Sequence, residues 1–415
     1  MSQRLHSIYT KPLALLEIGT SKTTCWIIAA QENKTFHIQG TAHQETCGYV
    51  RGRVIDLDAL SKRIARIVEE AENNAQTRIK SVALTLGGPF LQEKIHKSES
   101  NLLGAYVTQA DLQRLQQAAR LHAEPTTNHV LHIINQDYTL DDQPGIENPK
   151  GMIGKTLKGT FQIIFIPHLF LQNLLMAIKK IHLDVFYIAA TPYLTGRTLL
   201  SRDDQSLGAV LLDCGAGSTS LSTFKHNKLL SFDSIPLGGK HITRDLAYGL
   251  DVDLDAAERI KILQGTCLRG LYNTQSNVAY MKPALIHTQT TSFTDERLVD
   301  IIAPRVEEIV RCAHKVLKEH EKKRGFLQRV ILTGGSSQLI GFKEAATHIF
   351  GKQVRISGEP APQGLHGSVL EFSALTSLLQ EINSLKEQDF LSFQPTIPSG
   401  QRFFNHILSW FRDNL

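Results

Sequence analysis

Two short stretches place an acidic residue two positions before a glycine, and each follows an apolar run. Glu17 precedes Gly19 in LALLEIGTSK, and Asp213 precedes Gly215 in AVLLDCGAGS. Glycine lets the backbone approach a ligand closely, and consecutive turn amides form a concave site for an anion. If the two turns face each other, the carboxylates can hold a hydrated Mg²⁺ while the amides hold phosphates. Either turn alone is an ordinary connector, so the prediction depends on the pair.

A third glycine-rich turn, in ILTGGSS, also follows an apolar run. Competing nucleotide motifs fail. PKGMIGKT has Pro149 where a P-loop requires its first glycine, and in PLGGKHIT the Gly-Lys pair is followed by His241 instead of Ser or Thr. No GxSxG, HExxH or CxxC motif occurs, which argues against an α/β-hydrolase and a zinc site.

The elements around these turns indicate α/β architecture, because strands alternate with helices. The arrangement strand, acid, glycine turn, strand recurs after roughly 190 residues, which indicates two related halves that face each other. In the first half the pattern predicts a strand pair over 13–30, a helix over 56–75, a strand over 80–88, a strand over 162–167 with a helix up to residue 181, and a helix over 188–200. In the second half it predicts strands through 207–239, helices over 240–323 broken at 270–293, and a strand, two glycines and a helix across 329–342.

One segment departs from this alternation. Residues 89–165 are polar and irregular around one helix (108–122) and the strand HVLHII, so we expect an inserted module. Residues 384–400 lose periodicity and gain Pro, Ser and Gln, which is typical of a linker.

Composition adds weaker constraints. The net charge of +5 is spread along the chain, which is compatible with anionic lipid or an acidic partner and argues against nucleic acid. No stretch approaches ~20 apolar residues, so no transmembrane helix is expected. The five scattered cysteines favour reduced thiols in a cytosol.

The last segment, residues 401–415, is amphipathic. At 3.6 residues per turn its apolar stripe holds Phe403, Phe404, Ile407, Leu408, Phe411 and Leu415, with Trp410 at the edge. One interpretation is a helix that covers a groove of the core. The preceding linker and the aromatic residues near arginines favour a helix lying in a membrane interface.

The motifs EIGT, LLDCGAGST, PLGGKHIT and ILTGGSS, in this order and spacing, resemble the nucleotide site of the actin/Hsp70/sugar-kinase superfamily. The segment NHVLHIINQDYTLDDQPGIENPKGMIGKTLKG (128–159) resembles one typical of the FtsA family of bacterial cell-division proteins. The resemblance covers residues 13–379 and the terminal helix. It implies an actin-like two-lobed ATPase fold with duplicated ribonuclease-H-like halves, an inserted small subdomain and a C-terminal amphipathic helix.

The resemblance implies ATP and Mg²⁺ as ligands, with Glu17 and Asp213 serving the metal through water. The residues it implies at the nucleotide are Gly19, Thr20, Ser21, Lys22, Gly215, Ala216, Gly217, Ser218, Gly238, Gly239, Glu258, Lys261, Gly334, Gly335 and Ser336. For Glu258 and Lys261 a solvated pair on one helix is the alternative.

Two departures from hydrolysing members bear on turnover. Ser220 stands where an acid usually ends the second phosphate motif, and ATPYLTGRTLL lacks the Gln or Glu that would position water. Without such a group, binding need not lead to fast hydrolysis. We therefore expect ATP as a structural and conformational ligand, with weak or no ATPase activity.

The resemblance also implies a peripheral protein on the cytoplasmic face of the bacterial inner membrane, at the division septum, that tethers the FtsZ ring, forms filaments and contacts other divisome proteins. Arg305 is the position expected to pair with the acidic C-terminal peptide of FtsZ, unless it only caps a local carboxylate such as Glu308. The expected parts are a first core subdomain at 1–88 and 166–206 with 368–383, an inserted subdomain for self-association at 89–165, a second core subdomain at 207–240 and 325–367, an FtsZ-binding helical subdomain at 241–324, a flexible linker at 384–400 and a membrane-targeting helix at 401–415.

Three alternatives remain. An FtsA-like pilus-assembly ATP-binding protein should lack the amphipathic end. A sugar kinase would need a general-base Asp and a substrate pocket, and neither is visible in the sequence. An Hsp70-type chaperone would need a substrate-binding β-domain after residue ~380, where only a linker and one helix follow.

Overall fold

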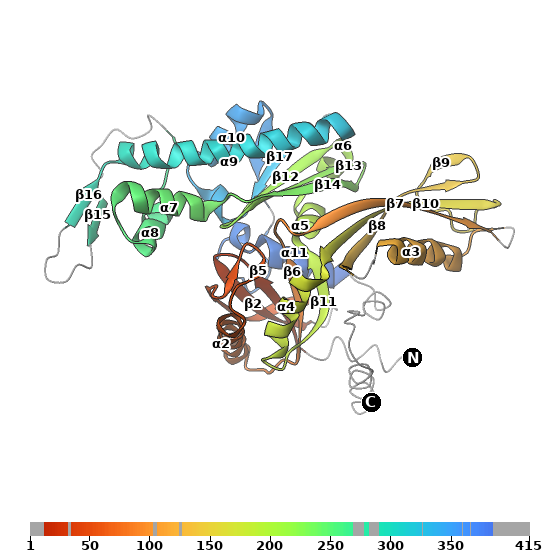
Figure 1. Ribbon diagram of the computed structural model, residues 1–415, viewed down its shortest axis with the longest axis horizontal. Helices are drawn as coiled ribbons and strands as arrows, with labels where there is room; N and C mark the ends of the chain where they lie inside the picture. Colours follow the sequence, from red (N-terminus) through yellow and green to blue (C-terminus); the bar gives the residue numbers. More distant parts are fainter. Residues whose placement is uncertain are drawn as a thin grey trace.

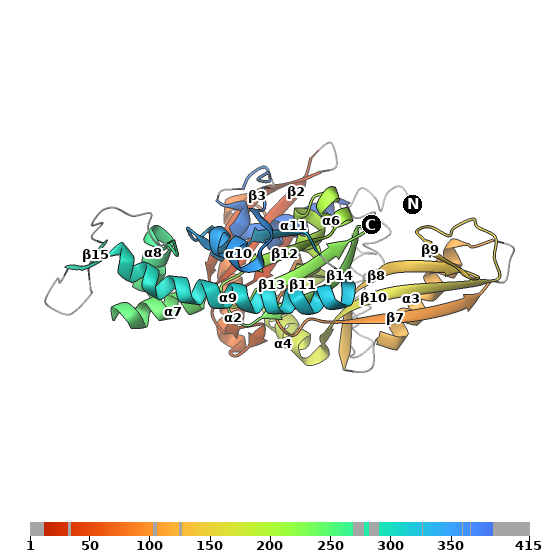
Figure 2. The same cartoon turned by 90° about the horizontal axis from the view of Figure 1, so that it is seen from above.

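The computed structural model describes residues 12–31, 35–102, 106–123, 127–268, 278–281, 290–325, 327–358, 360–365 and 367–384. The predicted linker beyond residue 384 and the predicted terminal helix lie outside the described residues. Two core sheets occupy the middle of an elongated molecule, with a small β-rich module at one end and a helical module at the other (Figures 1 and 2).

The first core sheet has five strands in the order β11-β6-β1-β2-β3. β1, β2 and β3 are antiparallel neighbours, whereas β1, β6 and β11 run parallel. Helices α2 and α4 pack on one face, and a short hairpin, β4 and β5, precedes α2. The bounds are β1 Leu13–Ile18, β2 Lys22–Ala30, β3 Phe36–Glu45, β4 Tyr49–Val50, β5 Arg53–Val54, α2 Leu57–Ala75, β6 Ser81–Leu86, α4 His168–Lys179 and β11 Asp184–Ala190.

The second core sheet repeats this topology in the order β14-β13-β12-β17-β18, again with three antiparallel strands and two added parallel ones. Helices α7 to α10 pack on its outer face. The predicted duplication is therefore confirmed. The bounds are β12 Ala209–Cys214, β13 Thr219–Lys225, β14 Lys228–Ile235, α7 Gly239–Leu250, α8 Leu254–Gln264, α9 Asp295–Arg324, β17 Arg329–Thr333, α10 Phe342–Phe350 and β18 Gln353–Ile356.

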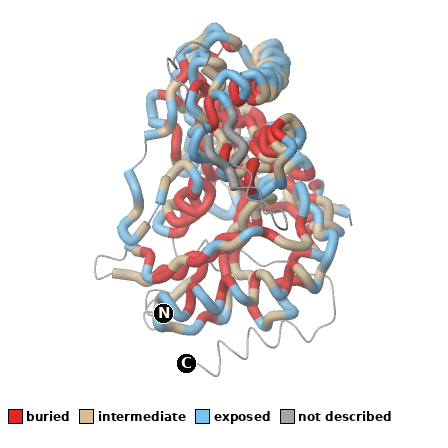
Figure 3. The backbone as a smooth tube through the Cα atoms, turned by 90° about the vertical axis from the view of Figure 1, so that its left-hand side faces the viewer, coloured by how far each residue is buried: buried red, intermediate tan, exposed pale blue. Residues whose placement is uncertain are grey.

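The helix that follows the last strand of each sheet packs against the other half. α5 (Thr191–Leu199) follows β11 but contacts β13 and β14, and α11 (Ser373–Ser384) follows β18 but covers the inner face of the first sheet. Figure 3 shows buried residues gathered in the sheets and in the sides of the helices that face them. This exchange of helices joins the two halves through one continuous interior.

Strand alternation decides where the two acids lie. Leu15 packs against α11 on the inner face of the first sheet, and Leu211 faces inward on the second. Side chains two positions apart in a strand share a face. Glu17 and Asp213 therefore both lie on inner faces, at the carboxyl ends of β1 and β12.

The inserted module is more regular than the sequence predicted. It is a four-stranded antiparallel sheet, β7-β10-β8-β9, with α3 packed against it. The strand β7, QEKIHKSESN, was not recognised because Ile95 is its one apolar residue, so the segment has no apolar alternation. The bounds are β7 Gln92–Asn101, α3 Gln109–Ala123, β8 Asn128–Leu140, β9 Gln143–Ile146 and β10 Thr156–Pro167.

Two predicted helices begin later than expected. The segment 188–200 was predicted as helix throughout, but its first three residues end β11 and the helix begins at Thr191, next to Pro192, which favours a first turn. After Gly334 the chain forms a short 3₁₀ turn, η1 (Gly335–Gln338), before α10 begins at Phe342. The remaining elements are α6 Arg202–Leu207, η2 Val369–Phe372, β15 Val278–Met281 and β16 Thr290–Phe293.

A buried carboxylate fixes α6 to the second sheet. Asp204 accepts hydrogen bonds from the Ser201 hydroxyl at 2.7 Å and from Arg329 Nη1 at 3.0 Å, and it also pairs with Arg355. Burial opposes ionisation of Asp204, but these hydrogen bonds and charges outweigh it and lower its pKa. A carboxylate whose pKa is lowered by folding stabilises the folded state at neutral pH.

We expect Asp204→Ala to lower the free energy of unfolding by about 3 kcal/mol, because two arginines lose their buried partner. The contribution should be present above pH 3.8, the ordinary aspartate value, and should vanish as the pH falls through the lowered pKa. Urea denaturation at several pH values measures both effects. Asp203→Ala removes an exposed carboxylate from the same helix and is the matched control. Equal losses in the two variants would contradict this assignment.

Candidate nucleotide-binding site

The first glycine turn (residues 19–22) and the second glycine turn (residues 215–218) have the same geometry. The Gly19 amide donates to the Lys22 carbonyl at 2.9 Å, and the Gly215 amide donates to the Ser218 carbonyl at 3.1 Å. A Cβ at either glycine would lie 2.9 Å from that same carbonyl oxygen. Each turn therefore requires its first glycine, as a backbone folded tightly around an anion would.

The two turns touch each other. A Cβ added at Gly217 would lie 2.5 Å from Thr20 Oγ1 and 2.7 Å from its Cβ, so only glycine allows this approach. Within the described residues, no hydrogen bond is donated by the amides of Ala216 and Gly217. The structure thus joins the predicted residues of the two halves at one point and leaves turn amides there for a ligand.

The two inner-face acids lie beside these turns. Burial raises the pKa of Glu17 to about 7, an effect that Lys22 opposes and nearby Asp213 increases. Burial also raises the pKa of Asp213 to about 6. Glu17 Oε2 is enclosed and has no hydrogen-bond partner among the described residues. A cation would favour the ionised form of both groups.

A hydrated Mg²⁺ fits this pair better than a directly ligated metal. Among the described residues, no group of three or more His, Cys, Asp and Glu side chains could hold a metal ion. Mg²⁺ keeps several of its waters and needs only one or two carboxylates together with phosphate oxygens. Glu17 and Asp213 would hold such an ion through water, which would neutralise charge on bound phosphates.

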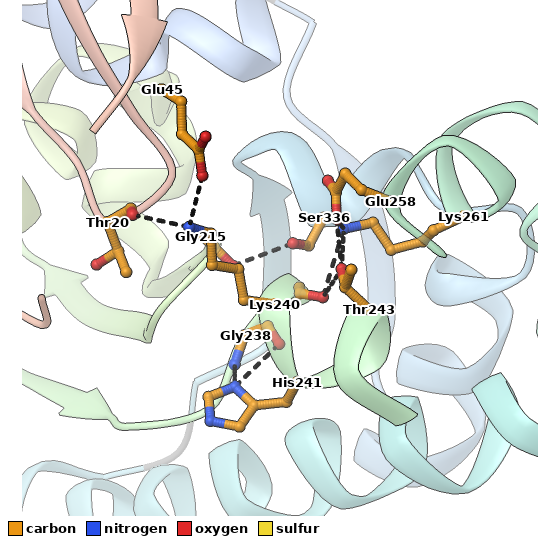
Figure 4. A network of polar contacts seen from close by, with 11 residues as sticks. Thr20, Glu45, Gly215, Gly238, Lys240, His241, Thr243, Glu258, Lys261 and Ser336 are labelled. Atoms are coloured by element: carbon orange, nitrogen blue, oxygen red, sulfur yellow. Dashed lines mark hydrogen bonds and ion pairs between the residues drawn. The ribbon is translucent and has the colours of Figure 1, made fainter. Parts of the chain in front are cut away.

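Hydrogen bonds from the start of α7 hold the second glycine turn in place. The amides of Gly239 and Lys240 donate to the carbonyls of Gly215 and Ala216 at 3.0 and 2.8 Å. A Cβ at Gly238 would lie 2.4 Å from the Gly215 oxygen, so this backbone contact requires glycine. Figure 4 shows Gly215, Gly238 and Lys240 close together at this point.

Glu258 and Lys261 form a partly buried pair. The Lys261 ammonium lies 2.6 Å from Glu258 Oε2, 3.0 Å from Thr243 Oγ1 and 3.4 Å from the Gly239 carbonyl (Figure 4). Burial lowers the pKa of Lys261, while Glu258 opposes that shift. The pair is therefore anchored to the start of α7, and a simple solvated helix pair does not describe it.

The third glycine turn (residues 334–336) meets the second. Gly334 has φ of +84°, and a Cβ there would lie 2.4 Å from Asp213 Oδ1. The Ser336 hydroxyl donates to the Gly215 carbonyl at 3.0 Å. A Cβ at Gly335 would meet only Glu371 Cγ, at 3.8 Å. All three predicted turns therefore converge, and Gly335 is the more open of the two glycines.

Several contacts at this site were missed by sequence reasoning. Lys22 forms an ion pair with Glu371 at 3.3 Å and lies over the ring of Phe372 at 3.8 Å. Lys240 donates from its ammonium to the Thr20 carbonyl at 3.2 Å, and Thr243 contacts Lys261. Lys22, Lys240 and Thr243 lie within the quoted motifs, but their partners are far away in the sequence, so the motifs did not indicate these contacts.

Ser220, which the sequence has in place of the usual acid, lies beside the metal-site candidate Asp213. Ser220 is the strand partner directly opposite Asp213 in the β12–β13 ladder. At the start of α5, Thr191 exchanges a hydrogen bond of 2.8 Å with Thr85. Hydroxyl groups are poor bases at neutral pH, so neither residue would readily deprotonate water.

Two further predicted residues or segments are not part of this site. Arg305, on α9, makes a bidentate contact with Asp245 at 2.6 and 3.0 Å and also pairs with Glu308. Arg305 therefore holds local carboxylates in this structure, and its pairing with an acidic peptide stays a prediction. The terminal stripe lies outside the described residues. Within the described part of the chain, no helix is long and apolar enough to cross a bilayer.

Comparison with known sequences points to one family. A family model described as "Cell division protein FtsA" matches residues 210–375, and one described as "SHS2 domain inserted in FTSA" matches residues 91–165. The "Cell division protein FtsA" of Agrobacterium fabrum (strain C58) is 31% identical over 381 residues, which cover 88% of this chain and 83% of that protein.

Comparison with solved structures gives the fold. The "PilM-PilN type IV pilus biogenesis complex" has a TM-score of 0.62 at 19% identity, covering 89% of this chain and 98% of that chain. MreB 5 of Spiroplasma citri, solved "bound to AMPPNP", has a TM-score of 0.51 at 11% identity, covering 90% and 97%. At such identities the likeness shows the fold alone, which is the mixed α/β actin-like fold.

Proposed function

The chain belongs to the FtsA family of cell-division proteins, and on this premise we propose that it is an ATP-binding division protein that tethers the FtsZ ring to the cytoplasmic membrane. It acts at the cytoplasmic face of the inner membrane, at the division septum, where it forms filaments and contacts other divisome proteins. Family membership supports the role in division, and the geometry of the site supports nucleotide binding.

One observation supports nucleotide binding above the others. Glycine turns from the two halves touch at Thr20 and Gly217, with Glu17 and Asp213 on the inner faces beside them. An MreB with the same fold has been solved with AMPPNP. Turn amides would hold the phosphates, and the two carboxylates would hold Mg²⁺ through water. With Ser220 opposite Asp213, turnover is weak, and ATP acts mainly on conformation and assembly.

The pilus-assembly alternative has no observation in its favour beyond the fold. The PilM chain is 19% identical, below the 31% of the Agrobacterium FtsA, although its fold is similar. The kinase and chaperone alternatives likewise share only the superfamily fold. We therefore retain the division function.

Membrane attachment is assigned to residues 401–415, the amphipathic segment predicted from the sequence. Immersing its apolar stripe gives part of roughly 10–15 kcal/mol, and ordering about 15 residues costs a comparable amount. A single tail should bind reversibly, and a filament that aligns many tails should bind firmly.

The proposed function is tested by reconstitution. The full chain is mixed with anionic vesicles, Mg·ATP and FtsZ, and the vesicles are pelleted. FtsZ should pellet only when the full chain is present, and FtsZ that lacks its C-terminal peptide should stay in solution. Pelleting of the full chain without any recruitment of FtsZ would refute the tethering role while leaving membrane binding intact.

The FtsZ contact is assigned to the helical subdomain expected at 241–324, and within it to Arg305 on α9, whose contacts suggest a test. Since Arg305 is held by Asp245 at 2.6 Å, an acidic peptide must compete with that carboxylate. We expect Arg305→Gln to weaken binding of the FtsZ peptide about tenfold and Asp245→Asn to strengthen it, because the latter frees the guanidinium. Fluorescence polarisation of a labelled peptide measures both.

If Arg305 does not bind the FtsZ peptide, the same two substitutions should give a different result. If Arg305 only holds Asp245 and Glu308 together, both substitutions should lower the melting temperature and leave the peptide affinity unchanged. Arg311→Gln, which breaks an exposed pair with Glu307 on the same helix, is the matched control.

A further inference from the structure

Lys240 is a cation in an unfavourable place. It is the second residue of α7, whose N-terminus carries the positive end of the helix dipole. Acidic residues are the favourable choice in a first turn, and the described first turn of α7 has none. A lysine at this position is destabilising unless an anion lies close to it.

The three lysines near the glycine turns differ in their partners. Lys22 lies 3.3 Å from Glu371, and Lys261 lies 2.6 Å from Glu258. The nearest carboxylate to Lys240 is Glu45, at 3.8 Å and with a side chain 71% exposed. Its hydrogen bond goes instead to the neutral carbonyl of Thr20 at 3.2 Å. Of these three ammonium groups, that of Lys240 is the least neutralised.

Lys240 also connects the two halves at the point where the turns meet. Its amide donates to Ala216 in the second glycine turn, and its ammonium donates to Thr20 in the first. Figure 4 shows its side chain directed toward Thr20 and Glu45, while Glu258, Lys261 and Ser336 gather on the other side of the network.

This arrangement gives a direction to a bound nucleotide. The turn amides without a partner, at Ala216 and Gly217, would hold the phosphates, and the Glu258–Lys261 pair, which the resemblance implies at the ribose, lies on the other side of α7's first turn. The phosphates of a nucleotide bound in this way would run from that pair toward the contact between the turns. The phosphate farthest from the sugar then lies nearest the Lys240 ammonium. We infer that Lys240 binds the terminal phosphate of ATP, distinguishes ATP from ADP, and links that phosphate to the contact between the two halves. This inference rests on the proposed nucleotide binding.

The test compares two nucleotides in one variant. ATP and ADP compete with a fluorescent ATP analogue in the presence of Mg²⁺. We expect Lys240→Gln to weaken ATP about tenfold, because a charge-assisted hydrogen bond is lost, and to leave ADP within about threefold. Lys240→Arg should retain most of the preference for ATP. Lys343→Gln removes the same charge from an exposed site on α10 and should change neither affinity.

A second measurement uses the unaltered chain and does not depend on the folding of a variant. Lys240 is labelled with an amine-reactive reagent and quantified by mass spectrometry. ATP should protect it strongly and ADP should not. Equal weakening of ATP and ADP in Lys240→Gln, or equal protection by both nucleotides, would overturn the inference and leave nucleotide binding itself standing. Failure of the unaltered chain to bind ATP would refute the proposed nucleotide function directly.

Discussion

Replacing Gly238 with alanine should lower the affinity for Mg·ATP by between about fivefold and about 150-fold. The new Cβ would lie 2.4 Å from the Gly215 oxygen and 2.8 Å from the Ala216 oxygen. Both atoms are backbone, so neither can rotate away, and the second glycine turn must shift. Overpacking of this kind costs about 1–3 kcal/mol, which corresponds to that loss of affinity. Titration with a fluorescent nucleotide measures it.

A matched control separates this effect from a general intolerance of alanine. Gly358 has no neighbour within 4 Å of the position of an added Cβ, so Gly358→Ala should bind ATP like the unaltered chain. Thermal melting without nucleotide should show both variants folded. Unchanged ATP affinity in Gly238→Ala would mean that the phosphates are not held by the second glycine turn.

The metal-dependent part of this affinity should depend on pH. Glu17, with a pKa raised to about 7, and Asp213, with one raised to about 6, are increasingly protonated as the pH falls through these values. Protonated carboxyl groups bind Mg²⁺ poorly, so the gain in ATP affinity on adding Mg²⁺ should grow from pH 6 to pH 8. Glu17→Gln should flatten this dependence. A gain that is constant across this range would argue against the two acids as the metal site.

Local sequence was sufficient wherever one segment forms its own structure. Glu17 and Asp213 were recognised because each ends a buried strand before a glycine, and the structure confirms both strands and both turns. The presence of two related halves followed from the repeat of this pattern, although the order of the strands in each sheet was not predicted. For each strand and turn, the signal lies in the segment that forms the structure.

Contacts between residues far apart in the sequence could not be predicted from the sequence, for a physical reason. The approach of Thr20 to Gly217 depends on how two sheets pack, and the Lys22–Glu371 pair joins residues 349 positions apart. The strand β7 was missed because only Ser98 of its residues is buried and Ile95 is its one apolar residue, so it carries no apolar alternation. The site is visible in the sequence as three separate turns, and only the tertiary fold makes it a single site.

The largest effect on localisation should come from the terminal segment, where two neighbouring residues take opposite sides of the predicted helix. Trp410 borders the apolar stripe, and Ser409 lies on the polar side. Trp410→Glu should reduce binding to anionic vesicles at least about tenfold, because an unpaired carboxylate resists transfer out of water. Ser409→Glu adds the same charge on the polar side of the predicted helix and should reduce vesicle binding much less. Vesicle co-sedimentation at fixed salt compares the two.

Tryptophan fluorescence of the unaltered chain gives an independent measurement. The chain has two tryptophans, and Trp26 is buried at 1% exposure in the first core sheet, so its emission should not respond to lipid. A blue shift on adding vesicles would therefore come from Trp410 entering an apolar environment. If the segment instead covers a groove of the core, Trp410→Glu should lower the melting temperature and vesicles should leave the emission unchanged. That second pattern would refute membrane attachment by this helix, because the apolar stripe would then already be buried against protein.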